Sequence, residues 1–318
     1  MLRPAAMTPP DPTNPGIDPA GDALRRGDLL IMPTETVYGL AADAANPEAV
    51  ARIYEAKGRP SFNPLIAHVT DLEAAQAIAW FDDRASRLAE AFWPGPLTIV
   101  APIRDAASVC DLARAGLDTV AVRAPGHPLS QAVLKAFGGP VVAPSANRSG
   151  RPSPTTFADA MAETGFAARA ALDGGACAVG LESTVVAVLD GPVRLLRPGG
   201  VTRAELEAVV GSLAEAEVDA KRSPGRLTLH YAPDAPVRLN ATGAGSGEAF
   251  IGFGPGCADD GLNLSPTGDL REAAARLFAY LRAADRQRPD VIAVAPIPDE
   301  GLGEAINDRL RRAAGFVG

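Results

Sequence analysis

Short apolar runs separated by amphipathic stretches fill most of the chain between residues 21 and 211. Apolar runs bounded by proline, glycine or polar residues are typical of buried strands, and they occur at 29–32, 65–69, 97–101, 119–123, 141–143, 169–172 and 183–189. Helical spacing beside a capping residue or an early proline predicts helices from residue 22, at 47–56, 71–79, 83–92, 128–137 and 157–163, and after Thr202. This mixture predicts an α/β or α+β domain over 21–211, without fixing the order of its strands.

The pattern changes after residue 211. Residues 212–235 start as a charged stretch and then carry turn residues and a His-Tyr pair, which is typical of a linker that can reach a ligand. Strands expected at 237–239, 249–253 and 291–294 and helices at 269–284 and 303–314 predict a small Rossmann-like α/β domain over 236–318. Residues 1–20, rich in proline, alanine and aspartate, predict a disordered tail.

Composition narrows the class of protein. The 318 residues are 47% hydrophobic, enough for a large core and, on length, for about two domains. A formal net charge of −8 disfavours a protein whose whole surface binds nucleic acid. The three cysteines and three histidines show no metal-ligand spacing, and no apolar run approaches the roughly 18 residues of a membrane span. We therefore expect a cytoplasmic protein with no membrane partner and no metal held by protein ligands.

Two short polar clusters are candidate anion-binding segments. Lys57 and Arg59 flank Gly58, whose flexibility would let both cations face one anion. Ser145 and Asn147 follow a buried strand, and arginines and serines continue to Ser153. Taken alone, the first cluster also fits solvated loop charges, and the second also fits an Asx-type turn.

The ends of other strands supply further candidates. Arg123 and Arg197 each end a strand and are followed within two residues by proline, which favours an anion clamp over two unrelated surface charges. Hydroxyl groups at 34, 36 and 38 follow the first strand and suit recognition of a small polar molecule. His68 fits either a sheet histidine satisfied by backbone or a group that binds substrate.

These segments together resemble the YrdC-type domain of threonylcarbamoyl-AMP synthases. The resemblance rests on Pro33-Thr34-Glu35-Thr36-Val37-Tyr38-Gly39-Leu40, Lys57-Gly58-Arg59-Pro60, Asn63-Pro64-Leu65, Trp93-Pro94-Gly95-Pro96-Leu97-Thr98, Arg123-Ala124-Pro125, Ser145-Ala146-Asn147, Glu182-Ser183-Thr184-Val185 and Arg197-Pro198-Gly199. Residues 223–233 and the C-terminal unit resemble the longer, two-domain version, so the resemblance covers about 21–316. It implies a YrdC-like twisted mixed sheet with flanking helices.

The resemblance also implies a reaction in which L-threonine, bicarbonate and ATP give threonylcarbamoyl-adenylate and pyrophosphate. The product would pass to a tRNA threonylcarbamoyltransferase complex for threonylcarbamoyladenosine formation. The implied catalytic residues are Lys57, Arg59, Ser145 and Asn147. The implied threonine contacts are Thr36, His68, Arg123, Ala143 and Ser183, and the implied ATP contacts are Arg59, Asn63, Thr119, Ser145, Ser153, Arg197 and Tyr231. Mg²⁺ would be held mainly by the ATP phosphates.

Two other functions compete with this interpretation. A double-stranded RNA or tRNA-binding module would use the same cations on backbone phosphates and would show salt-dependent affinity. Carbamoyl transfer from carbamoyl phosphate, as in hydrogenase-maturation proteins, would need zinc-finger and acylphosphatase-like modules that the chain lacks. For the second domain we expect a lid or regulatory unit whose linker gates the site, and whether tRNA is bound directly stays open.

Overall fold

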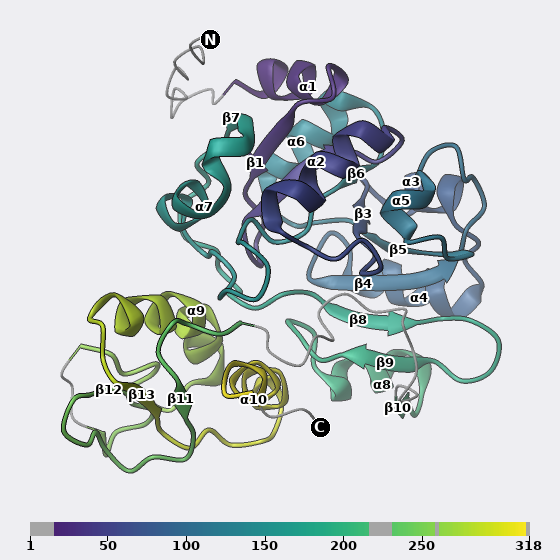
Figure 1. Ribbon diagram of the computed structural model, residues 1–318. Coiled ribbons are helices and arrows are strands. Elements are labelled where there is room, and N and C mark those ends of the chain that lie inside the picture. The colour runs from purple at the N-terminus through teal and green to yellow at the C-terminus, as the bar shows by residue number, and fades with distance from the viewer. Residues whose placement is uncertain (1–15, 216–230, 258–260, 316–318) are drawn as a thin grey trace, which may run out of the picture.

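The predicted strands assemble into one mixed sheet in the computed structural model, which describes residues 16–215, 231–257 and 261–315 (Figure 1). The sheet order is β10-β9-β8-β4-β5-β3-β6-β2-β1-β7. Its strands are β1 Leu29–Met32, β2 Gly39–Asp43, β3 Ile66–His68, β4 Leu97–Pro102, β5 Thr119–Arg123, β6 Val141–Val142, β7 Ala168–Ala171, β8 Thr184–Ala187, β9 Arg194–Arg197 and β10 Ala214–Glu215. The predicted α/β class is confirmed.

The helices of this unit begin where the sequence places capping residues. They are α1 Ile17–Arg25, α2 Pro47–Lys57, α3 Leu72–Ile78, α4 Asp83–Phe92, α5 Asp111–Arg114, α6 Pro128–Phe137, α7 Phe157–Thr164 and α8 Arg203–Val210. Asp71, Asp82 and Thr156 each accept a backbone N–H with the side chain. Thr202 and Glu205 form the predicted capping box.

The N-terminal prediction is wrong at its inner end. Residues 17–20 lie in helix α1 rather than in a tail, and Ala20 is buried. Ile17, Ala20 and Leu24 pack with α6 beside the sheet, so an amphipathic face outweighs the polar composition of the segment. Residues 1–15 lie outside the described part of the chain.

Helices pack on both faces of the sheet: α1 and α6 cover β1, β2 and β6 on one face, whose remaining part carries a small apolar surface, and α2 and α5 lie on the other face. Strands β3 and β5 are parallel, with Ala67 beside Val122 and His68 beside Arg123. Ala67 and Val122 pack in the core that includes residues of α2 and α5. Because side chains alternate along a strand, Arg123 points to the opposite face. There, an apolar floor is formed by Val100, Ala121, Val185, Ala187 and Leu196.

The second unit is a small α/β continuation of the chain. Strands β11 Val237–Arg238, β12 Glu248–Ile251 and β13 Val291–Val294 form a parallel sheet in the order β11-β13-β12. Figure 1 shows helices α9 Leu270–Arg286 and α10 Leu302–Ala313 between this sheet and the larger unit. The α/β prediction for this region is confirmed.

The two units meet through closely packed segments. Gly180 lies against α9 so tightly that an added Cβ would come within 2.4 Å of the Ala275 Cα, and its φ of +72° also favours glycine. Val37, Leu181 and Tyr231 pack into the core of the second unit. In the described part of the chain, no helix has the length and apolar character needed to cross a membrane.

Candidate active site

A cavity of about 50 Å³ brings together most of the predicted site residues from segments far apart in the sequence. Its lining includes Thr36, Arg59, His68, Arg123, Ala143, Ser145, Ser183, Arg197 and Tyr231. It lies where the parallel strands β3 and β5 end, which is the usual ligand-binding edge of such strands. The remaining predicted residues lie behind this lining or elsewhere.

Two loops at the cavity are joined by backbone hydrogen bonds. The Leu40 N–H donates to the Pro144 carbonyl at 2.8 Å, and the Ala146 N–H donates to the Tyr38 carbonyl at 2.7 Å. The hydroxyl-rich loop after β1 and the loop after β6 are therefore held as one unit. This places Thr36 and Ser145 on the same cavity wall.

Lys57 lies behind the cavity and supports its wall. Its ammonium donates to the backbone carbonyls of Ser145 and Asn147 and is 3% exposed. Burial, reinforced by the nearby Arg59 guanidinium, lowers the pKa of Lys57 well below its usual value. The side-chain amide of Asn147 in turn donates to the carbonyls of Arg148 and Arg151 at 2.8 Å each. Both residues thus fix the loop that carries Ser145.

Arg59 reaches the cavity from the turn after α2. Gly58 ends that helix in the left-handed conformation, with a φ of +59°. The Arg59 guanidinium donates to the carbonyls of Asn63 and Pro64 at 3.3 and 3.1 Å. Burial lowers the pKa of Arg59 to about 10, so the group stays charged at neutral pH. The side-chain carbonyl oxygen of Asn63 is buried and has no hydrogen-bond partner among the described residues.

Arg123 is held at the cavity by three hydrogen-bond acceptors and still has N–H groups that are not used in these bonds. It donates to Glu35 Oε1 at 2.6 Å, to Thr36 Oγ1 at 2.9 Å and to the Gly95 carbonyl at 3.2 Å. A guanidinium has five N–H donors, so two remain for an incoming carboxylate. Burial opposes ionisation of Glu35, but Arg123 holds the pKa of that carboxyl below its usual value.

His68 is neutral beside Arg123. Burial, with the Arg123 charge, lowers the pKa of His68 to about 3. Its Nδ1 lies 3.1 Å from the Ile66 carbonyl, an acceptor to which the tautomer protonated at Nδ1 donates. The structure therefore combines both sequence interpretations, since His68 is satisfied by backbone and also lines the cavity.

Ser183 and Arg197 form another part of the cavity wall. Arg197 donates twice to the Ser183 carbonyl, at 3.2 and 2.8 Å, and the Ser183 hydroxyl lies 2.7 Å from Thr98 Oγ1. Burial lowers the pKa of Arg197 from its usual value. Arg59, Arg123 and Arg197 thus surround one small cavity, an arrangement suited to more than one anionic group.

Sequence reasoning gave no role to Glu182, which also lines this cavity. Its carboxylate accepts the Ser153 hydroxyl proton and the Nε–H of Arg309 from α10, the latter at 2.9 Å. The position of Glu182 directly before Ser183 was a usable signal. No signal in the sequence pointed to Arg309, because it lies in a run of charged residues that is typical of a solvent-exposed helix face.

Tyr231 connects the cavity with the second unit. It lines the cavity, is 1% exposed, and packs against Phe278 with ring centroids 5.4 Å apart. The linker segment before it, including Ser223-Pro224-Gly225 and His230, lies outside the described residues.

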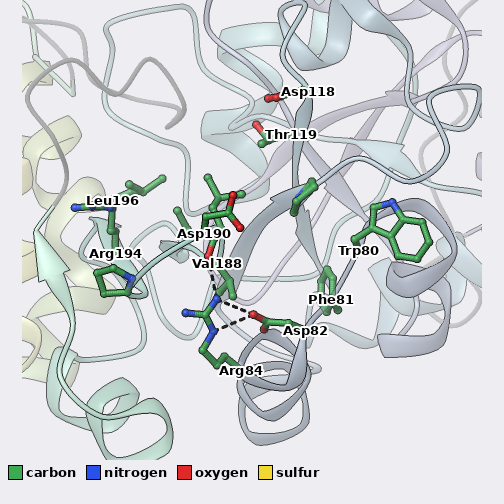
Figure 2. A pocket seen from close by; sticks show the side chains of 14 residues that line it. Trp80, Phe81, Asp82, Arg84, Asp118, Thr119, Val188, Asp190, Arg194 and Leu196 are labelled. Atoms are coloured by element: carbon green, nitrogen blue, oxygen red, sulfur yellow. Dashed lines mark hydrogen bonds and ion pairs between the residues drawn. The ribbon is translucent and has the colours of Figure 1, made fainter.

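Thr119 lies apart from the other predicted residues. It lines a second cavity of about 590 Å³ at the opposite end of β5 (Figure 2), together with Trp80, Asp190 and Leu196. Thr119, Ala121 and Arg123 share one face of β5, and the apolar floor lies between the two cavities. Both cavities therefore open on the same face of the sheet.

The fold and site define a two-domain protein whose mixed sheet presents arginines and hydroxyls to a small anionic ligand. A family model described as "Telomere recombination", covering the Sua5, YciO and YrdC proteins, matches residues 22–199. Another, described as "Threonylcarbamoyl-AMP synthase, C-terminal domain", matches residues 201–315. The chain belongs to the threonylcarbamoyl-AMP synthase family, as the resemblance predicted.

Individual relatives agree with this membership. The threonylcarbamoyl-AMP synthase of Bacillus subtilis is 38% identical over 95% of this chain and 94% of its own. The crystal structure of Pyrococcus abyssi Sua5 complexed with L-threonine has a TM-score of 0.86 at 37% identity, covering 94% of each chain. Full-length HypF has a TM-score of 0.50 at 20% identity and matches over 31% of its chain, a likeness of fold alone.

Proposed function

We propose that the protein makes threonylcarbamoyl-AMP and pyrophosphate from L-threonine, bicarbonate and ATP. The observation that carries the proposal is one cavity in which Arg123 and neutral His68 face Arg59, Ser145 and Arg197. The first pair suits an amino-acid carboxylate, and the second group suits phosphate oxygens. The relative from Pyrococcus abyssi, solved with L-threonine, supports the amino-acid half.

Threonine would bind with its carboxylate on the two unused N–H groups of Arg123. The hydroxyls of Thr36 and Ser183 and the backbone at Ala143 line the same space and would hold the rest of the molecule. His68 adds no positive charge. It therefore does not compete with Arg123 for the carboxylate.

The chemistry needs a carbamate kept dry beside ATP. The threonine amine attacks bicarbonate, and water leaves as the N–C bond forms. A carbamate oxygen then attacks the α-phosphorus, the bond to the bridging oxygen breaks, and pyrophosphate leaves with its electron pair. Negative charge grows on the phosphoryl oxygens in this step, so fixed donors such as Arg59 and Arg197 stabilise the transition state.

The nucleotide would lie along the open face of the sheet. With its phosphates near Arg59 and Arg197, the adenosine would cover the apolar floor towards Thr119. Residues 119 and 123 are about 13 Å apart at 3.3 Å per residue, a separation that an extended nucleotide can span. The Ser153 hydroxyl donates a hydrogen bond to Glu182, so the lone pairs of its oxygen would accept a hydrogen bond from the nucleoside.

Mg²⁺ would bind to the ATP phosphates rather than to the protein. Among the described residues, Glu182 lines the cavity and is paired with Arg309, and Glu35, which contacts the lining residue Arg123, is paired with it. When bound, the ion would neutralise phosphate charge. We also propose a cytoplasmic location and transfer of the product to a tRNA threonylcarbamoyltransferase complex.

The RNA-binding alternative is disfavoured by burial of the cations. Arg123 and Arg197 are 4% and 5% exposed and face a cavity rather than an open surface. A duplex backbone is too large to reach them there. Buried arginines in a small cavity suit a small anionic ligand rather than a duplex.

The proposal is tested by pyrophosphate release from ATP. The wild-type protein should release pyrophosphate only when L-threonine and bicarbonate are both present. Arg59→Ala should abolish this release, with Arg169→Ala, a change on β7 away from the cavity, as the matched control. Release that ignores threonine or bicarbonate would refute the reaction, and unchanged turnover in Arg59→Ala would refute the site.

A further inference from the structure

We propose that Arg309, from the last helix of the second domain, is a positioning residue for the ATP half of the active site, acting through Glu182. This inference rests on the proposed function. It gives the second domain a direct part in the reaction, in place of a lid or regulatory role alone.

Arg309 reaches across the domain boundary and is completely buried. Its Nε donates to Glu182 Oε2 at 2.9 Å, and its NH1 group donates to the Pro198 carbonyl at 2.9 Å. The guanidinium carbon lies 5.3 Å from the centre of the Tyr231 ring, a cation–π distance. One side chain therefore contacts three segments that supply cavity residues.

Each of these segments carries a residue assigned to ATP or threonine. Glu182 precedes Ser183 and holds the Ser153 hydroxyl, Pro198 follows Arg197, and Tyr231 lines the cavity itself. Displacement of Arg309 would release the residues assigned to ATP, which are Ser153, Arg197 and Tyr231. The hydroxyl of the threonine contact Ser183, in contrast, is also held by Thr98 at 2.7 Å. An apolar side chain at position 309 could fill the same space, but it would not join these segments by hydrogen bonds.

The positive charge of Arg309 also compensates the negative charge of Glu182. Glu182 is 6% exposed and lines a cavity expected to receive a triphosphate. An unpaired carboxylate there would repel the phosphates and would itself be costly to bury. Arg309 neutralises Glu182, which leaves Arg59 and Arg197 free to attract the nucleotide. Asp308, beside Arg309 in sequence and partly exposed, accepts from it at 2.7 Å and is also paired with Arg312.

Another ion pair between the two units serves as a control. Arg203 on α8 donates to Glu304 on α10 at 2.8 Å, and both side chains are about 30% exposed. Neither residue lines the cavity. Glu304→Gln therefore weakens a contact between the same helix and the larger unit without touching Glu182.

The test compares Arg309→Met, Glu182→Gln, the double variant and Glu304→Gln in threonine- and bicarbonate-dependent pyrophosphate release. Arg309→Met should raise the KM for ATP at least about tenfold, with the KM for threonine changed less than about threefold. The double variant should recover at least about half of that loss, because it removes the unpaired charge as well. Glu304→Gln should match the wild-type protein in both constants.

Each possible result decides the inference. A wild-type KM for ATP in Arg309→Met, or losses that simply add in the double variant, would overturn it. If Arg309→Met does not fold, Arg309→Lys decides, since its single ammonium cannot reproduce the planar fork: a KM for ATP raised at least about threefold supports the inference, and a wild-type value overturns it. If the wild-type protein shows no such activity, the proposed function fails instead.

Discussion

The ammonium of Lys57 donates a hydrogen bond to the backbone carbonyl of Ser145, 88 positions further along the chain. A second bond to the Asn147 carbonyl completes the contact. The two polar clusters that stood out in the sequence are therefore physically joined. Their relationship differs from the simplest expectation, because Lys57 supports the anion-binding loop and does not line the cavity.

Lys57→Met should weaken ATP binding more than threonine binding. The substitution keeps most of the side-chain volume but leaves two carbonyls unpaired, at a cost of about 1–3 kcal/mol for each one left buried. The Ser145 loop should shift, while the strands that carry His68 and Arg123 should not. Calorimetric titration of both ligands measures this, with Lys135→Met on the exposed side of α6 as the control. Wild-type ATP affinity in Lys57→Met would contradict the assigned role.

Thr36→Val should mainly raise the KM for threonine, whereas Thr119→Val should mainly raise the KM for ATP. Thr36 accepts a bond from the charged Arg123, so its loss should raise the KM for threonine by about 10-fold or more. Thr119 lies at the far end of the apolar floor, and its loss should raise the KM for ATP by about 2- to 10-fold. Steady-state kinetics with each substrate varied in turn distinguishes the two. A Thr119→Val enzyme with an unaltered KM for ATP would remove that residue from the site.

His68 should make the protein less stable as the pH falls below about 6.5. The folded pKa of about 3 lies below the unfolded value of about 6.5, so the unfolded chain binds the additional proton between these limits. The free energy of unfolding should therefore fall by about 1.4 kcal/mol per pH unit in this window relative to His68→Gln. Urea unfolding of both proteins from pH 7 to pH 5 provides the comparison. Parallel curves would show that His68 does not titrate in this way.

Gly199→Ala should impair activity by a purely steric effect. A Cβ at this position would lie 2.4 Å from the Glu182 carbonyl oxygen and from the Thr184 nitrogen. The segment after Arg197 would have to move away from β8, separating Arg197 from Ser183. We expect a loss of turnover of at least about 10-fold. Gly243→Ala, where nothing lies within 4 Å of the added Cβ, should change neither turnover nor melting temperature.

Local signals in the sequence predicted most elements and much of the site. Pro128 and the residues after it predicted a helix at 128–137, which the structure confirms at both ends. Arg123 and Arg197 at strand ends were placed at a clamp, and both line the cavity. These predictions succeeded because caps, strand ends and turns depend on residues close together in sequence.

Features set by long-range contacts could not be predicted in the same way. Strand β2, Gly39–Asp43, is rich in small residues with low strand propensity and forms through its pairing with β1 and β6. The Tyr231 ring is another such feature, since it packs in the core of the second unit. Arg309 shows the same limit, because its partner Glu182 lies 127 positions away.

The most direct test of the account follows labelled bicarbonate into the product. With ¹³C-bicarbonate, L-threonine and Mg·ATP, the wild-type protein should form one adenylate whose mass contains threonine, AMP and the labelled carbonyl carbon, with pyrophosphate in equal amount. Omission of any one substrate should abolish that species. An adenylate that lacks the label, or pyrophosphate released without a threonine-containing adenylate, would contradict the claim that this cavity adenylates a threonine carbamate.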